Sequence, residues 1–144
     1  MTTVAFLGLG AIGTPMARHL AVPEFSLSVW NRTAAKATAF AAEFAVRAAA
    51  TPAEAARGTD FVITCLPSSR EVEGLLDGPD GLLAGMAKGS VLVDCTSGDP
   101  ATSRRIAAHY GHKYLICPIG LKRGHANVMA RCSLATEGWR NADI

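Results

Sequence analysis

The sequence has few charged residues, and the two signs nearly cancel. Charged side chains make up 18% of its 144 residues, and 14 lysines and arginines against 12 acids leave a formal charge of +2. Proteins that bind nucleic acid or anionic membrane surfaces usually carry a marked basic excess. The apolar runs are all shorter than the roughly 18 residues that a membrane-spanning helix needs. We therefore expect no nucleic-acid partner and no membrane association.

Closely spaced cysteines are also absent. The chain has 4 cysteines and no Cys-x-x-Cys pair, which argues against a zinc site or a disulfide framework. Cys65, Cys95 and Cys117 each fall inside or at the end of an apolar run. Small buried thiols are typical of a reducing compartment, and no basic leader precedes the first apolar run. We expect a cytoplasmic protein with no bound metal and no secretory signal.

The sequence does have enough apolar residues for a sizeable core. Hydrophobic residues make up 49% of the chain, and its length is typical of about one domain. Apolar segments alternate with helical patterns, and strands that are apolar throughout are typical of a parallel sheet covered on both faces. Trp30 and Phe61 fall within such strands, so we expect both side chains in the core.

Strands and helices are expected in alternation. The strands are predicted at 4–7, 25–30, 45–48, 60–66, 90–95 and 112–117, and the helices at 12–20, 34–44, 68–76, 82–86 and 100–110. Another helix is expected to start at Pro52, with Thr51 as its cap and Glu54 as the acidic residue of its first turn. This order predicts an α/β fold of the Rossmann type, a doubly wound parallel sheet with helices on both faces, over residues 1–118. We leave residues 119–144 as an unassigned tail. In such a sheet the ligand lies at the carboxyl ends of the strands.

A Gly-x-Gly-x-x-Gly pattern follows the first strand and opens the first helix. Gly8 permits the tight turn, Gly10 lets bare backbone approach a pyrophosphate, and Gly13 lets the helix lie close to the strand. The helix N-terminus adds N–H groups and a partial positive charge for a phosphate. The pattern predicts a dinucleotide site. Glycine-rich turns also form plain structural corners, and that alternative stays open.

The end of the second strand indicates which dinucleotide is preferred. NAD sites usually place an acid here for the ribose 2′-hydroxyl, whereas this chain has Asn31 and Arg32. Asn31 would not repel a 2′-phosphate, Arg32 can make fork-shaped hydrogen bonds to it, and Thr33 can donate another. Lys36 adds a second cation. We expect NADP rather than NAD, the alternative being a solvated arginine beside a helix cap.

Two further strands end in residues that belong at the same edge of the sheet. Leu66 and Pro67 close the fourth strand and are expected to form a wall of the site. Asp94 ends the fifth strand, and the hydroxyls of Thr96 and Ser97 follow it. These hydroxyls are either turn formers or groups that face the nicotinamide ribose and substrate, and the sequence leaves both alternatives open.

Together these motifs resemble the β-hydroxyacid dehydrogenases, a family that includes 3-hydroxyisobutyrate and tartronate-semialdehyde enzymes. The cofactor domain of that family is similar to that of 6-phosphogluconate dehydrogenase. The matching segments are 8–17, 30–33, 65–68 and 94–100. The resemblance implies hydride transfer between NADP and a short β-hydroxyacid, with a lysine as acid and base. It also implies cofactor contacts at Gly8, Leu9, Gly10, Ala11, Ile12, Gly13, Asn31, Arg32, Thr33, Leu66, Pro67 and Thr96.

The resemblance weakens after Pro118. The family has a substrate-binding serine where this chain has Gly120, and its catalytic lysine lies in a helical second domain that these 144 residues do not match. We therefore name no catalytic residue and expect a truncated cofactor-binding domain that is inactive alone. The alternative is a stand-alone nucleotide-sensing regulatory domain. The identity of the β-hydroxyacid and the oligomeric state stay open.

Overall fold

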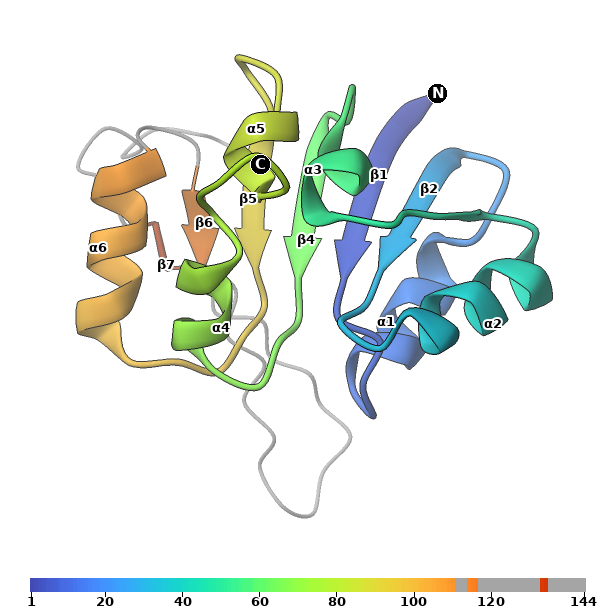
Figure 1. Cartoon of the computed structure of the whole chain (residues 1–144), viewed down its shortest axis with the longest axis horizontal. Helices are drawn as coiled ribbons and strands as arrows, with labels where there is room; N and C mark the ends of the chain where they lie inside the picture. Colours follow the sequence, from blue (N-terminus) through green and yellow to red (C-terminus); the bar gives the residue numbers. More distant parts are fainter. Residues whose placement is uncertain (111–113, 117–132, 135–144) are drawn as a thin grey trace.

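The described strands form one sheet with helices packed on it (Figure 1). The computed structural model describes residues 1–110, 114–116 and 133–134. The strands are β1 (Thr2–Leu7), β2 (Phe25–Trp30), β3 (Arg47–Ala48), β4 (Phe61–Thr64), β5 (Val91–Asp94), β6 (Tyr114–Ile116) and β7 (Ser133–Leu134). The helices are α1 (Gly13–Leu20), α2 (Ala34–Phe44), α3 (Pro52–Ala56), α4 (Ser69–Gly74), α5 (Leu82–Gly85) and α6 (Pro100–Tyr110).

The order of the strands places a reversal at β1. The sheet runs β3-β2-β1-β4-β5-β6-β7, so the chain moves outward from β1 in one direction and then resumes on its other side at β4. Every pairing from β3 to β6 is parallel, and β7 pairs antiparallel with β6. The predicted doubly wound Rossmann-type sheet is confirmed. Its reversal is the place where such sheets bind ligands.

The alternation of side chains along β1 shows how both faces are covered. Val4 and Phe6 pack in a cluster with residues of β2, α1 and α2. Ala5 and Leu7 point to the other face, into a cluster with residues of α3, α4, α5, β5 and α6. All four side chains are at most 2% exposed. A strand buried on both faces needs an unbroken apolar run, which is what the sequence shows.

The boundaries of some elements differ from the sequence-based expectation for local reasons. Ala45 takes a left-handed conformation with φ of 54° to end α2, so β3 begins only at Arg47. Thr33 occupies the N-cap position of α2, but its side chain makes no capping hydrogen bond. Phe61, expected in the core, is 38% exposed because it lies at the start of β4, at the amino edge of the sheet.

Two points can be made of the described residues only: how the tail pairs with the sheet, and whether a helix could span a membrane. Of the segment 119–144, the structure describes Ser133 and Leu134, which form β7 beside β6. The rest of the unassigned tail falls on residues that are not described. None of the helices in the described part of the chain has the length and apolar character needed to cross a bilayer.

Candidate functional site

A cavity of about 550 Å³ opens at the carboxyl ends of β1, β2 and β4, where the strand order reverses. Two backbone hydrogen bonds hold these ends together: the Gly8 amide donates to the Trp30 carbonyl at 3.0 Å, and the Cys65 amide donates to the Leu7 carbonyl at 2.9 Å. Figure 1 shows these ends on one edge of the sheet, with α1, α2 and α4 around them. The lining residues are Gly8, Gly10, Ala11, Ile12, Gly13, Trp30, Asn31, Arg32, Thr33, Lys36, Cys65, Leu66, Pro67, Glu71, Gly74 and Leu75.

The fold requires two glycines of the glycine-rich turn, whereas it does not require the third. Gly8 has φ of 107°, and a Cβ there would lie 2.2 Å from the Cys65 carbonyl oxygen. A Cβ on Gly13 would lie 1.8 Å from the Gly8 carbonyl oxygen, so α1 packs directly on the end of β1. Gly10 is exposed, and a Cβ there would meet nothing within 4 Å. The described residues therefore give no steric reason for glycine at position 10.

Asn31 braces the glycine-rich turn. Its Oδ1 accepts a hydrogen bond from the Leu9 amide at 2.9 Å, and its Nδ2 donates to the Thr33 carbonyl at 3.1 Å. The Leu9 side chain is 4% exposed and packs in the core with β1 and β2 residues. Leu9 thus does not line the cavity, although its amide is part of the turn that does. The sequence indicated that Asn31 is neutral but not that it fastens one loop to the other.

The rim of the cavity at the end of β2 is basic. Arg32, Thr33 and Lys36 are exposed and line it. Arg32 and Lys36 make no ion pair within 4.0 Å among the described residues. Both cations are therefore available to an anionic group of a ligand. Glu71, from α4, lines the same cavity and brings a negative charge that the order of motifs along the sequence did not indicate.

A buried carboxylate joins the ends of β4 and β5. Asp94 is 1% exposed, and its Oδ1 accepts hydrogen bonds from the Thr64 hydroxyl and the Thr96 amide, both at 2.9 Å. The Thr96 hydroxyl in turn accepts from the Leu66 amide at 3.0 Å. Thr96 is 3% exposed and does not line the cavity, whereas Leu66 does. Through Thr96, Asp94 holds the wall that Leu66 and Pro67 form.

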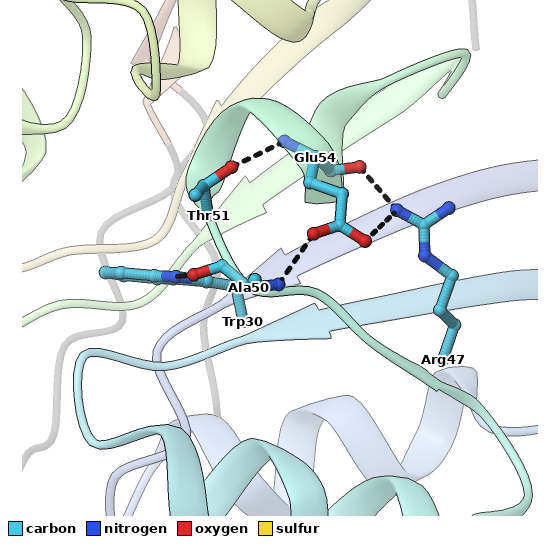
Figure 2. Close-up of polar contacts among 5 residues, drawn as sticks. All are labelled: Trp30, Arg47, Ala50, Thr51 and Glu54. Carbon is cyan, nitrogen blue, oxygen red and sulfur yellow. Dashed lines mark hydrogen bonds and ion pairs between the residues drawn. The ribbon is translucent and has the colours of Figure 1, made fainter.

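Trp30 forms an aromatic part of the wall, and a polar network fixes its ring (Figure 2). The indole Nε1 donates to the Ala50 carbonyl at 3.3 Å, and the Ala50 amide donates to Glu54 Oε2 at 2.9 Å. Glu54 also pairs with Arg47 at 3.3 Å, and its amide donates to the Thr51 hydroxyl at 3.1 Å. The expected Thr51 cap of α3 is confirmed. The same cap holds the segment that anchors the indole.

The structure brings together every predicted site residue except Leu9 and Thr96. It adds Trp30, Cys65, Glu71, Gly74 and Leu75, which sequence reasoning missed. Trp30 and Cys65 directly adjoin predicted residues, so their positions at strand ends were a usable signal. Glu71 had a weaker one: Ser68-x-x-Glu71 is a capping-box pattern at the start of a helix that faces the site. Among the described residues, no group of three or more metal-ligating side chains occurs.

The Cys65 thiol is expected to react slowly with alkylating reagents. Its partial burial and the nearby Asp94 carboxylate raise its pKa, so the nucleophilic thiolate forms only at a higher pH than in an ordinary cysteine. Iodoacetamide labelling at a series of pH values, read by peptide mass spectrometry, should place the midpoint for Cys65 above the ~8.5 of a free cysteine. Asp94→Asn should lower that midpoint. A Cys65 midpoint at or below that of a free cysteine would contradict the expectation.

Comparison with known proteins, like the geometry of the cavity, indicates a dinucleotide-binding domain. Residues 3–121 match the family described as the NAD binding domain of 6-phosphogluconate dehydrogenase. The NAD-dependent L-serine dehydrogenase of Pseudomonas aeruginosa is 38% identical over 108 residues, which are 75% of this chain and 36% of that protein.

Two solved structures share the fold. A 3-hydroxyisobutyrate dehydrogenase of Mycobacterium tuberculosis, solved with L-serine, superimposes with a TM-score of 0.74 at 28% identity, over 84% of this chain and 41% of that one. An imine reductase of Myxococcus stipitatus in complex with NADP+ has a TM-score of 0.72 at 26% identity, over 83% and 42%. The chain spans less than half the length of each of these relatives. The chain belongs to the family of the NAD binding domain of 6-phosphogluconate dehydrogenase, and the proteins similar to it include 3-hydroxyisobutyrate dehydrogenases and other oxidoreductases.

Proposed function

We propose that this chain is the NADP-binding part of a dehydrogenase that transfers hydride between NADP and a short β-hydroxyacid. The observation that carries the cofactor site is Gly10, which lines the cavity with open space where a Cβ would be. A glycine there suits a ligand whose pyrophosphate lies against bare backbone. The α1 N-terminus, at Ile12 and Gly13, lines the same cavity and favours an anion through its N–H groups and partial charge.

The apolar residues of the wall and the residue that positions the glycine-rich turn have different roles in binding. Trp30, Leu66, Pro67 and Leu75 offer apolar surface to the flat rings of a dinucleotide, and Asn31 keeps the glycine-rich turn in register with the end of β2. The nicotinamide ring supplies the hydride chemistry when the cofactor is bound. The part of this chain in that reaction is to bind and orient the cofactor at the edge of the sheet.

The basic rim supports NADP as the preferred cofactor. A 2′-phosphate near Arg32 can accept two parallel hydrogen bonds from the guanidinium, with Thr33 and Lys36 beside it. An acid at the end of β2, which would select NAD, is replaced by Asn31. A stand-alone nucleotide sensor would share this cavity, but such sensors usually keep that acid. The matching L-serine dehydrogenase is described as NAD-dependent.

NADPH is expected to bind at least about tenfold more tightly than NADH, a difference of ~1.4 kcal/mol. Arg32→Ala should remove most of that difference and leave NADH binding nearly unchanged, because only the 2′-phosphate uses the guanidinium. Titration of each cofactor by nicotinamide fluorescence or calorimetry gives both dissociation constants. Arg104→Ala, which removes an exposed arginine from α6, is the matched control and should leave both unchanged. Equal affinities of the unmutated chain for NADPH and NADH would rule out the assignment of NADP.

The substrate is proposed from the relatives. Their names point to three-carbon and branched four-carbon hydroxyacids, L-serine and 3-hydroxyisobutyrate. We propose that residues 1–118 form the cofactor domain, and that the protein works in the cytoplasm, where the thiol of Cys65 stays reduced.

A further inference from the structure

The rim of the cavity carries opposite charges on facing elements. Arg32 lies just after β2, whereas Glu71 lies in the first turn of α4, and both line the cavity. They do not form an ion pair within 4.0 Å in the described part of the chain. Glu71 instead accepts a hydrogen bond from the Ser68 hydroxyl of its own helix start. Its carboxylate is thus held at the start of its own helix and is not paired with Arg32 in the described part of the chain.

Glu71 remains ionised under ordinary conditions. The hydrogen bond from Ser68, followed by smaller effects that include the positive charge of Arg32, lowers the pKa of the Glu71 carboxyl. Its position in the first turn of α4 favours the same charge. The two side chains therefore act on each other electrostatically across the cavity without contact. A phosphate bound by Arg32 would feel the same negative charge.

We propose that Glu71 is a specificity-determining residue that limits the preference of this cavity for NADP over NAD. This inference rests on the proposed binding of NADP in the cavity. A 2′-phosphate placed on Arg32 and Lys36 brings a charge of about −1.5 to −2 to the rim that Glu71 also lines. Repulsion by the carboxylate offsets part of the attraction from the two cations. The uncharged 2′-hydroxyl of NAD is not repelled, so Glu71 narrows the difference between the two cofactors.

The test compares Glu71→Gln with Glu73→Gln in the full 144-residue chain. Glutamine suits the third position of the helix as glutamate does, so Glu71→Gln removes the charge and retains the capping group. Glu73 lies on the same short helix, but its carboxylate pairs with Arg105 of α6 at 3.1 Å and does not line the cavity. The two variants therefore remove the same charge from the same helix, on different sides.

Glu71→Gln is expected to raise the ratio of NADPH to NADH affinity about fivefold at low salt, a typical size for one partly screened charge. The increase should shrink when about 0.5 M NaCl is added, because salt screens exposed charges. Glu73→Gln should leave the ratio unchanged. A ratio that stays constant or falls in Glu71→Gln, including equal weakening of both cofactors, would overturn the inference. If the unmutated chain binds neither cofactor, the proposed function itself fails, which is a distinguishable result.

Discussion

Gly10→Ala is expected to weaken the binding of NADPH and NADH alike, by about ten- to thirtyfold. The added methyl group enters the space that we assign to the cofactor, and overpacking of this kind costs roughly 1.4–2 kcal/mol. The fold should be unaffected, because a Cβ at this position meets no atom of the described residues within 4 Å. Calorimetric titration gives the affinities, and thermal unfolding followed by circular dichroism gives the stability.

Gly13→Ala is the matched substitution, and we expect it to lower the stability of the fold where Gly10→Ala does not. Its Cβ would lie 1.8 Å from the Gly8 carbonyl oxygen, so α1 has to move away from the end of β1. We expect a clear fall in Tm for this variant and none for Gly10→Ala. Unchanged affinity for both cofactors in a natively folded Gly10→Ala protein would mean that the turn is only a structural corner.

These two glycines also show how much of the site could be predicted from the sequence. The spacing of the motif placed both at the end of the first strand, because a buried apolar run followed by glycines has few ways to turn into a helix. The sequence also placed the basic residues of the rim, since they directly follow a strand. Positions defined by local order along the chain were therefore predictable.

Side-chain direction was less predictable than position. Leu9 and Thr96 lie next to cavity-lining segments but point inward, one into the core and the other to the Leu66 amide. A loop does not have the period of a strand or helix, so its sequence does not say which residues face the ligand. Glu71 was missed for a related reason: it comes from a helix that reaches the site through tertiary packing. Phe61 was expected in the core because apolar character alone does not tell the amino edge of a sheet from its middle.

The 144-residue chain is expected to bind its cofactor without measurable dehydrogenation of β-hydroxyacids. Hydride transfer from such a substrate requires a group within hydrogen-bond reach of the hydroxyl to take its proton. The ionisable side chains among the described lining residues are Arg32, Lys36, Cys65 and Glu71. None of them is suited to that task at the nicotinamide.

Each of these groups has a physical reason to be a poor base. Arginine stays protonated in proteins, and Lys36 lies beside Arg32 on the rim that we assign to the 2′-phosphate. The raised pKa of Cys65 keeps its proton in place, and the lowered pKa of Glu71 makes its carboxylate a weak proton acceptor. By resemblance, the family takes its catalytic lysine from a helical domain. The loss of a general acid–base step typically costs 10²–10⁴-fold in rate, ~3–5 kcal/mol of barrier.

The measurement follows nicotinamide absorbance with NADP and NAD, using 3-hydroxyisobutyrate, glycerate and L-serine, and with the reduced cofactors and the matching aldehydes. A full-length 3-hydroxyisobutyrate dehydrogenase is assayed alongside as the positive control. Cofactor titration on the same preparation shows that the site is intact, so a lack of turnover is not confused with a lack of binding. Saturable turnover within about a hundredfold of the control, with the KM for the cofactor raised by Gly10→Ala, would contradict the prediction. It would show that residues outside the described part of the chain supply a catalytic group to this cavity.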